Sequence, residues 1–152
     1  AEAVPPLILI SDNIGGDMKI AVIGGGGREH AIIKKLKLNP TVERIYALPG
    51  NGGMTGDAEC VPIKAMELDK IVTFCREKAV DFVVIAPDDP LIAGLKDMLN
   101  AVGIPSFGPD KAAAEIEGSK AFAKELMKNT VFRLRHTRSL PTKPPHWHTL
   151  TD

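Results

Sequence analysis

The sequence predicts an α/β fold built on a doubly wound parallel sheet. Short β-rich runs alternate with amphipathic helical stretches between residues 18 and 128, and such alternation is typical of parallel sheets. The run at residues 82–85 is apolar throughout, as strands buried on both faces tend to be. The chain has 152 residues, of which 44% are hydrophobic and 25% charged. This composition suits one globular domain.

Five strands are expected, at residues 19–23, 44–48, 59–63, 81–86 and 104–107. The runs are short and mostly apolar, and glycine-rich loops follow the first two. In a parallel sheet the carboxyl ends of the strands lie along one edge, where ligands bind. The loops after the first, second, fourth and fifth strands are therefore the candidate ligand loops.

Five helices are expected, at residues 28–38, 67–78, 91–102, 110–116 and 119–128. Apolar residues recur at helical spacing in the first two. Asn-Pro stops the first helix and a glycine ends the third. The last two begin at an aspartate and a serine, which are good N-caps. Strands and helices in this order give a Rossmann-like topology.

Composition and cysteine usage exclude several classes of partner. Lys plus Arg and Asp plus Glu number 19 each, so we expect neither nucleic acid nor an acidic membrane surface as partner. No apolar run reaches the roughly 18 residues of a membrane span, and residues 4–10 lack the basic start and cleavage site of a signal peptide. Cys60 and Cys75 have no metal-ligand spacing, so we expect buried free thiols and a cytoplasmic location.

The first strand runs directly into four glycines, Gly24–Gly27, followed by Arg28, Glu29 and His30. Glycine lets a ligand approach the backbone, and the following helix points free N–H groups and its positive dipole end at the turn. We expect a phosphate-bearing ligand here; a tight turn without a ligand is the alternative. A dinucleotide fingerprint would need glycine or alanine in place of Glu29, and an acidic residue where the second strand ends at Leu48.

Two further loops follow strands at the same edge. Residues 49–53 read Pro-Gly-Asn-Gly-Gly, which can expose backbone donors to a ligand or serve as a flexible connector. Residues 86–91 join a buried strand to a helix and carry two carboxylates. Asp88 is a candidate for holding a ligand hydroxyl or amine. Asp89 is expected to cap the helix, with Pro90 in its first turn.

Four strings, taken in order, carry a resemblance to a known family. They are Val-Ile-Gly-Gly-Gly-Gly-Arg-Glu-His at 22–30, Pro-Gly-Asn-Gly-Gly at 49–53, Ala-Pro-Asp-Asp-Pro-Leu-Ile-Ala-Gly at 86–94, and Phe-Gly-Pro at 107–109 with Glu-Gly-Ser-Lys-Ala-Phe-Ala-Lys at 117–124. Together they resemble the N-terminal domain of phosphoribosylamine–glycine ligase (glycinamide ribonucleotide synthetase), a purine-synthesis enzyme of the ATP-grasp superfamily. One departure is that the family often has Gly-Pro-Glu where this chain has Ala-Pro-Asp.

The resemblance implies a reaction in which glycine, activated as an acyl phosphate, is joined to 5-phosphoribosylamine, while ATP becomes ADP and phosphate. ATP and Mg²⁺ would serve the full-length enzyme, as phosphoryl transfer requires, and neither is expected to bind this fragment tightly. The fragment is expected to be inactive alone, and the full-length enzyme to be a monomer. No metal ligand is assigned to this chain.

The resemblance also implies a division of the chain and a set of site residues. Residues 18–118 would form the pre-ATP-grasp domain, and residues 119–128 would begin a truncated ATP-grasp region. Lys120 is the one candidate for the ATP site. The substrate-binding residues would lie in the three loops: Gly25, Gly26, Gly27, Arg28, Glu29, Pro49, Gly50, Asn51, Gly52, Pro87, Asp88 and Pro90.

Both ends of the chain depart from the family. After residue 128 the family continues with a string such as Tyr-Gly-Ile-Pro-Thr-Ala, which a shift of one base restores when residues 129–136 are back-translated. We hypothesise that residues 129–152 are a frameshifted tail, which the gene sequence tests. Residues 14–18 can be encoded with a ribosome-binding sequence before the Met18 codon. We therefore expect residues 1–17 to be a disordered translated leader, which N-terminal sequencing of natively expressed protein tests.

Two other functions stay open on the residues alone. A stand-alone module that binds a nucleotide or sugar phosphate would use the same glycine turn, but it would not need the segment at residues 118–124. One half of an NAD-linked dehydrogenase would share the fold, but Glu29 and the missing acidic residue after the second strand oppose it.

Overall fold

The computed structural model describes residues 18–129, which form a five-stranded parallel sheet with helices on both faces. The strand order is β3-β2-β1-β4-β5, so the chain changes direction across the sheet between β1 and β4. The predicted doubly wound parallel fold is confirmed. The strands are β1 (Met18–Gly24), β2 (Val42–Pro49), β3 (Glu59–Cys60), β4 (Phe82–Ile85) and β5 (Ser106–Phe107).

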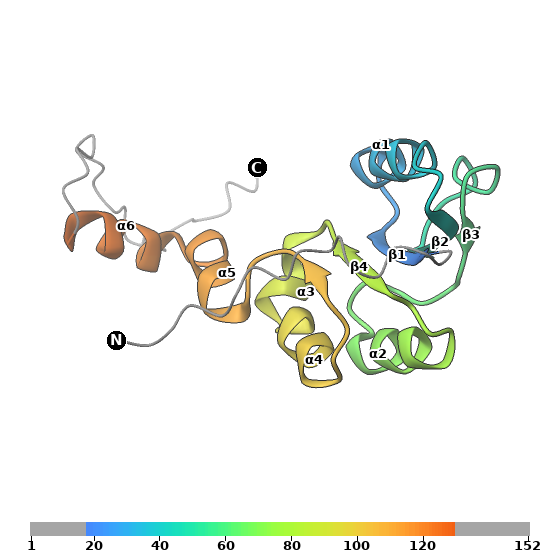
Figure 1. Ribbon diagram of the computed structural model, residues 1–152. Coiled ribbons are helices and arrows are strands. Elements are labelled where there is room, and N and C mark those ends of the chain that lie inside the picture. The colour runs from blue at the N-terminus through green and yellow to red at the C-terminus, as the bar shows by residue number, and fades with distance from the viewer. Residues whose placement is uncertain (1–17, 130–152) are drawn as a thin grey trace, which may run out of the picture.

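The helices form a layer on each side of the sheet. α1 covers one face, and α2 and α4 lie on the other (Figure 1). α5 follows β5, and α6 packs against α5 at the end furthest from β3. The bounds are α1 (Gly27–Leu36), α2 (Leu68–Glu77), α3 (Asp88–Ile92), α4 (Leu95–Ala101), α5 (Lys111–Gly118) and α6 (Lys120–Asn129).

The segment after β4 differs from the expectation. The single helix predicted at 91–102 is wrong, because the chain forms α3 and α4 with a break at Gly94, whose φ of +96° favours glycine. Asp89 is not the cap either, since Pro87 holds the N-cap position of α3. Asp88 and Asp89 lie in its first turn, where carboxylates face the positive end of the helix dipole.

Two other differences concern the sheet edges, and two predicted caps are confirmed. β3 and β5 are shorter than expected because they are edge strands, each with one neighbour in the sheet. Asp110 caps α5 by accepting a hydrogen bond from the Ala113 N–H at 2.8 Å. The Ser119 hydroxyl accepts from the Phe122 N–H at 3.2 Å and so caps α6.

β1 lies at the centre of the sheet, and its side chains alternate between two cores. Ala21 and Ile23 belong to the larger core, which includes the buried faces of α2 and α4. Ile20 and Val22 belong to the smaller core, together with Ile33 of α1. Because β1 is covered on both faces, it is buried along its length except at Met18 and Lys19, at its amino end.

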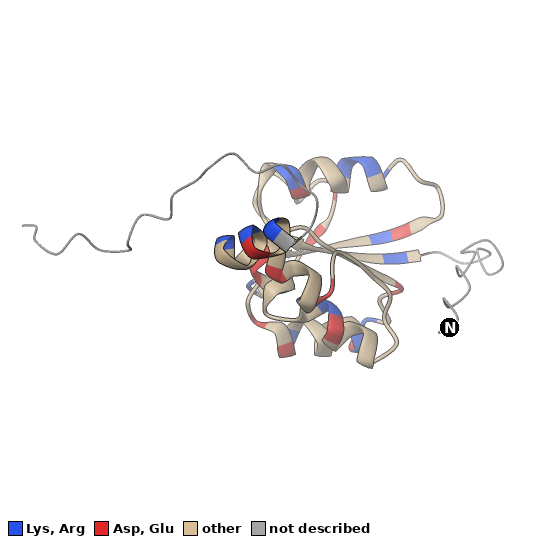
Figure 2. Cartoon of the chain, turned by 90° about the vertical axis from the view of Figure 1, so that its left-hand side faces the viewer, with Lys and Arg blue, Asp and Glu red and all other residues tan. Residues whose placement is uncertain are grey.

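The charged residues of β1 and β2 lie near the amino ends of these strands, as Figure 2 shows. They are Lys19 on β1, and Glu43 and Arg44 on β2. The carboxyl-terminal halves of both strands are apolar and buried. Polar chemistry at the carboxyl edge must therefore come from the loops that follow the strands.

Both cysteines are free thiols, as expected. Cys75 is fully buried, and burial raises the pKa of its thiol to about 12. Cys60 is half-buried on the edge strand β3, so the expected burial is wrong for this residue.

Within residues 18–129, no helix combines the length and apolarity that a membrane span requires. The expected leader (1–17) and the tail from residue 130 onwards lie outside the described residues.

Candidate functional site

The loops after β1 and β2 are joined by hydrogen bonds at the carboxyl edge of the sheet. The Gly50 N–H donates to the Gly24 carbonyl at 3.2 Å. The Asn51 side-chain amide donates to the Gly25 carbonyl at 2.7 Å. The loop after β4 reaches the same place, since a Cβ built on Gly24 would lie 3.3 Å from the Pro87 ring. Three of the four candidate ligand loops, those after β1, β2 and β4, therefore come together.

Glu29 is buried beneath the glycine turn, with 5% of its surface exposed. Its Oε2 accepts a hydrogen bond from the Gly26 N–H at 2.6 Å, and its Oε1 accepts from Arg28 Nε at 3.2 Å. A Cβ on Gly24 would lie 2.7 Å from Glu29 Cγ, and one on Gly26 would lie 2.6 Å from Glu29 Oε2. These two glycines are required because the carboxylate fills the space that side chains would need.

The other glycines of the two loops divide into packed and open positions. A Cβ on Gly25 would lie 2.6 Å from the Gly50 carbonyl oxygen, so the loops touch backbone to backbone. Gly50 has a φ of +69° and packs against the Cys60 thiol. Around Gly27 and Gly52 no atom lies within 4 Å of a built Cβ. Packing does not require glycine at these two exposed positions, and both leave room for a ligand.

The arrangement leaves backbone donors facing outward. The carbonyls of Gly24 and Gly25 are taken by the second loop, and the N–H of Gly26 is taken by Glu29. The N–H groups of Gly27 and Arg28 meet no acceptor among residues 18–129. Both lie in the exposed first turn of α1, where helix N–H groups and the helix dipole favour an anion. The turn can therefore bind a phosphate through its backbone.

The second loop is fixed from inside as well. Asn51 Oδ1 accepts from the Gly53 N–H at 2.7 Å, and the Asn51 carbonyl accepts from the Met54 N–H at 3.0 Å. Met54 is fully buried in the smaller core, which also includes Ile33 of α1. The loop is thus anchored to the same core as α1, while most of its other residues are exposed.

Asp57, which ends this loop, was not among the predicted site residues. Its carboxylate contacts His30 Nε2 at 3.3 Å, Lys34 Nζ at 3.1 Å and Lys37 Nζ at 3.0 Å. The side chain of Asp57 is 18% exposed. Sequence spacing carried a signal, because residues 30, 34 and 37 share one face of a helix and form a cationic stripe. The stripe did not indicate which carboxylate it binds.

The predicted site residues differ in exposure. Glu29 and Pro90 are buried, so they shape the loops from within. Lys120 begins α6, which lies away from the glycine turn (Figure 1). The half-buried residues are Gly25, Pro49, Gly50 and Pro87, and the exposed ones are Gly26, Gly27, Arg28, Asn51, Gly52 and Asp88.

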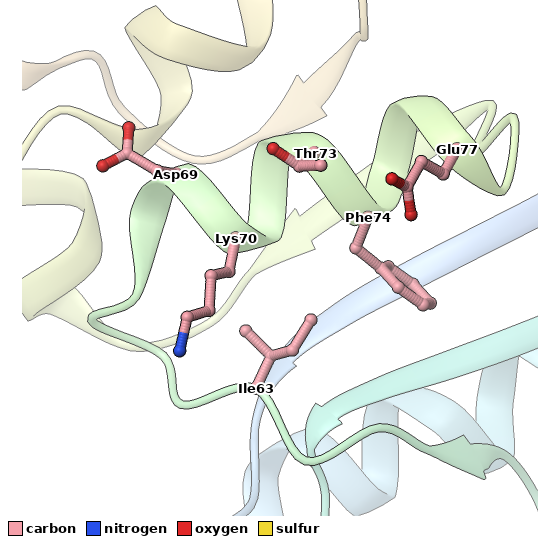
Figure 3. Close-up of a pocket in the computed structure, with 6 residues that line it drawn as sticks. All are labelled: Ile63, Asp69, Lys70, Thr73, Phe74 and Glu77. Carbon is pink, nitrogen blue, oxygen red and sulfur yellow. The ribbon is translucent and has the colours of Figure 1, made fainter.

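A hollow of about 340 Å³ lies beside α2. Lys70 and Phe74 extend from α2 towards Ile63, whereas Asp69 extends to the other side (Figure 3). Phe74 also packs edge-to-face on Tyr46 of β2. None of the residues that line this hollow belongs to the loops after β1, β2 or β4. This hollow therefore does not coincide with the predicted site.

Fold and site together define an α/β domain that offers backbone donors to an anion at the carboxyl edge of its sheet. The family described as "Phosphoribosylglycinamide synthetase, N domain" matches residues 18–117. The chain belongs to this family. It is 50% identical over 109 residues to the phosphoribosylamine–glycine ligase of Agrobacterium fabrum, and 47% identical over 110 residues to that of Caldanaerobacter subterraneus. Each match covers 72% of this chain and 26% of the relative, so the chain spans about a quarter of these relatives.

Solved structures agree with this assignment. The crystal structure of phosphoribosylamine–glycine ligase from Thermotoga maritima is 29% identical with a TM-score of 0.54, and the match covers 74% of this chain and 25% of that one. The biotin carboxylase domain of a thermophilic 2-oxoglutarate carboxylase, bound to bicarbonate, has a TM-score of 0.58 at 18% identity. That match covers 73% of this chain and 27% of the carboxylase domain, and it shows a shared fold alone. The family resemblance drawn from the sequence is confirmed.

Replacing Glu29 by alanine is expected to destabilise the domain by about 1–3 kcal/mol, the usual cost of losing a hydrogen bond to a charged group. The Gly26 N–H loses its acceptor, and a space opens beneath the turn. Urea denaturation of the wild type and the variant measures the effect. Glu77→Ala changes an exposed carboxylate on α2 and is the matched control. Equal losses in both variants would contradict a structural role for Glu29.

The contribution of Asp57 to stability is expected to depend on pH. Lys37 first, then Lys34 and His30, hold the pKa of the Asp57 carboxyl below its usual range. Because the folded-state pKa lies below the unfolded value of about 3.9, the contribution is fully present above about pH 5. It is lost as the pH falls through about 4 towards the folded-state pKa.

The free energy of unfolding of the wild type should therefore exceed that of Asp57→Asn at neutral pH. This difference should shrink as the pH falls from about 5 to about 2. The control is Asp69→Asn, since Asp69 forms no ion pair within the described part of the chain. A difference for Asp57→Asn that is constant over this range would rule out the ion pairs as its cause.

Proposed function

We propose that this chain is the 5-phosphoribosylamine-binding part of a phosphoribosylamine–glycine ligase of purine synthesis. The complete reaction joins glycine and 5-phosphoribosylamine to give glycinamide ribonucleotide, while ATP becomes ADP and phosphate. Membership of the family over residues 18–117 supports the reaction. The match to 26% of the ligases supports a partial role, in which the fragment is inactive alone. The reduced thiols suit the cytoplasmic location that we infer for it.

One observation carries the proposal for the ligand. In the glycine turn the carbonyls of Gly24, Gly25 and Gly26 are taken by neighbouring protein groups, and the donors without an acceptor among residues 18–129 include the N–H groups of Gly27 and Arg28. A phosphate accepts hydrogen bonds and donates few, so this surface suits the 5-phosphate of a ribosyl ligand. Arg28, whose side chain is 61% exposed, can add a cationic contact.

The remaining polar groups suit the rest of the same ligand. Asp88 is exposed at the start of α3, and Pro87 beside it packs near Gly24. We propose that the Asp88 carboxylate accepts hydrogen bonds from a ribose hydroxyl or from the 1-amino group. Asn51 and Gly52 lie on the facing loop, and we propose that their exposed backbone groups close the site from the other side.

The described residues do not fit a Mg²⁺ site. No group of three or more His, Cys, Asp or Glu among residues 18–129 is placed to hold a metal ion. We therefore assign no step to a metal here, and place ATP, Mg²⁺ and glycine on other parts of the complete ligase. On this proposal the residues of this chain bind and orient the amine that attacks the activated glycine carboxyl group.

Gly27→Ala tests the proposal directly. A Cβ at this position meets no protein atom within 4 Å, so the fold should persist while the ligand is obstructed. In isothermal titration, the wild-type chain should bind ribose 5-phosphate but neither ATP nor NAD. Gly27→Ala should weaken ribose 5-phosphate binding by about tenfold or more, which corresponds to about 1.4 kcal/mol.

Ala112→Ser is the control, since Ala112 is exposed on α5 and lies outside the loops of the predicted site. It should bind ribose 5-phosphate as the wild type does. Binding of NAD would overturn the proposal in favour of a dinucleotide site. Equal affinities of Gly27→Ala and the wild type would show that the ligand does not approach the glycine turn.

A further inference from the structure

The loop from Gly50 to Asp57 faces the glycine turn without the support of a strand. Four of its eight residues are Gly50, Gly52, Gly53 and Gly56, and such a glycine-rich segment is flexible when it is not held in place. At its inner end Asn51 ties it to the turn. A loop held only by Asn51 and by the short strand β3 that follows it would lose conformational freedom on ligand binding, and that loss would weaken the affinity.

The outer end of the loop is held by Asp57. Its carboxylate meets three cationic or imidazole groups of α1, at distances of 3.0 to 3.3 Å. Lys37 Nζ also donates to the Gly56 carbonyl at 2.8 Å, so it contacts the loop at two neighbouring residues, Gly56 and Asp57. The His30 ring lies 3.7 Å from the position of a Cβ on Gly53, and so supports the middle of the loop.

These contacts all arise from the helix whose first turn carries the free N–H groups. Met54 and Ile33 are both fully buried in the smaller core, which adds an apolar anchor shared by the same loop and the same helix. Single exposed ion pairs contribute little, but here two lysine ammonium groups and the His30 ring converge on one partly buried carboxylate. The loop and the amino end of α1 therefore form one unit with a fixed spacing.

We propose that Asp57 is a positioning residue for the ligand site, which through Lys37, Lys34 and His30 holds the loop at residues 50–57 against the glycine turn before the ligand binds. The inference rests on the proposed function, because it assigns a role in binding the same phosphoribosyl ligand. Asp57 itself acts through the loop and does not touch the ligand.

A purely electrostatic role for Asp57 predicts the opposite sign. If its negative charge merely repelled the phosphate or masked Lys34 and Lys37, then removing that charge would strengthen phosphate binding. If Asp57 positions the loop, its removal weakens binding, because the ligand must then order the loop. The direction of the change therefore separates the two roles.

The test uses the complete 152-residue chain and ribose 5-phosphate as the probe. Isothermal titration at neutral pH should show that Asp57→Asn binds at least about fivefold more weakly, with a less favourable binding entropy. Amide hydrogen exchange at residues 51–57 should become faster by a larger factor than exchange in β1 and β4, which follows the loss of global stability alone. Asp57→Glu, which keeps the charge, should recover part of the affinity for ribose 5-phosphate and part of the slow exchange at residues 51–57. The control Asp69→Asn on α2 should match the wild type in both measurements.

Unchanged or tighter binding by Asp57→Asn would overturn the positioning role and leave the proposed function intact. Failure of the wild-type chain to bind ribose 5-phosphate would overturn the proposed function, and the positioning role with it. Should Asp57→Asn not fold, Lys37→Met carries the same expectation, because it removes the contacts to Asp57 and Gly56 while keeping the carboxylate. Wild-type affinity and loop exchange in Lys37→Met would equally overturn the inference.

Discussion

The site depends on the buried carboxylate of Glu29. Its hydrogen bond to the Gly26 N–H fixes the shape of the turn between β1 and α1. The space that it occupies is the reason that Gly24 and Gly26 carry no side chain. Because this carboxylate takes the Gly26 N–H, the donors without an acceptor among residues 18–129 include the N–H groups of Gly27 and Arg28 in the first turn of α1. A ligand phosphate would therefore supply the hydrogen-bond acceptors that these N–H groups lack.

Much of this arrangement could be predicted from the sequence. The alternation of apolar runs and amphipathic stretches predicted the five parallel strands, since each pattern has its own period. Gly24–Gly27 predicted a turn that a ligand could approach, because glycine carries no side chain to keep a ligand from the backbone. The topology then placed the loops after β1, β2 and β4 at one edge, as the structure shows.

Other features depend on contacts between residues far apart in the chain. Glu29 looked like a departure from a dinucleotide fingerprint, and its burial emerged only with the position of the turn. Asp57 lies 20 to 27 residues from its partners on α1, and sequence spacing gives no register for such a pair. The break at Gly94 was missed because apolar residues continue across it.

The central claim is that the amides of Gly27 and Arg28 bind the phosphate, while Glu29 keeps the Gly26 amide occupied. Two-dimensional NMR of the 15N-labelled chain during a titration with ribose 5-phosphate tests this most directly. The account predicts that the amide resonances of Gly27 and Arg28 shift most, with a small change at Gly26 and none at the α2 residues Lys70 and Thr73. Shifts that centre on those α2 residues, with Gly27 and Arg28 unaffected, would contradict it.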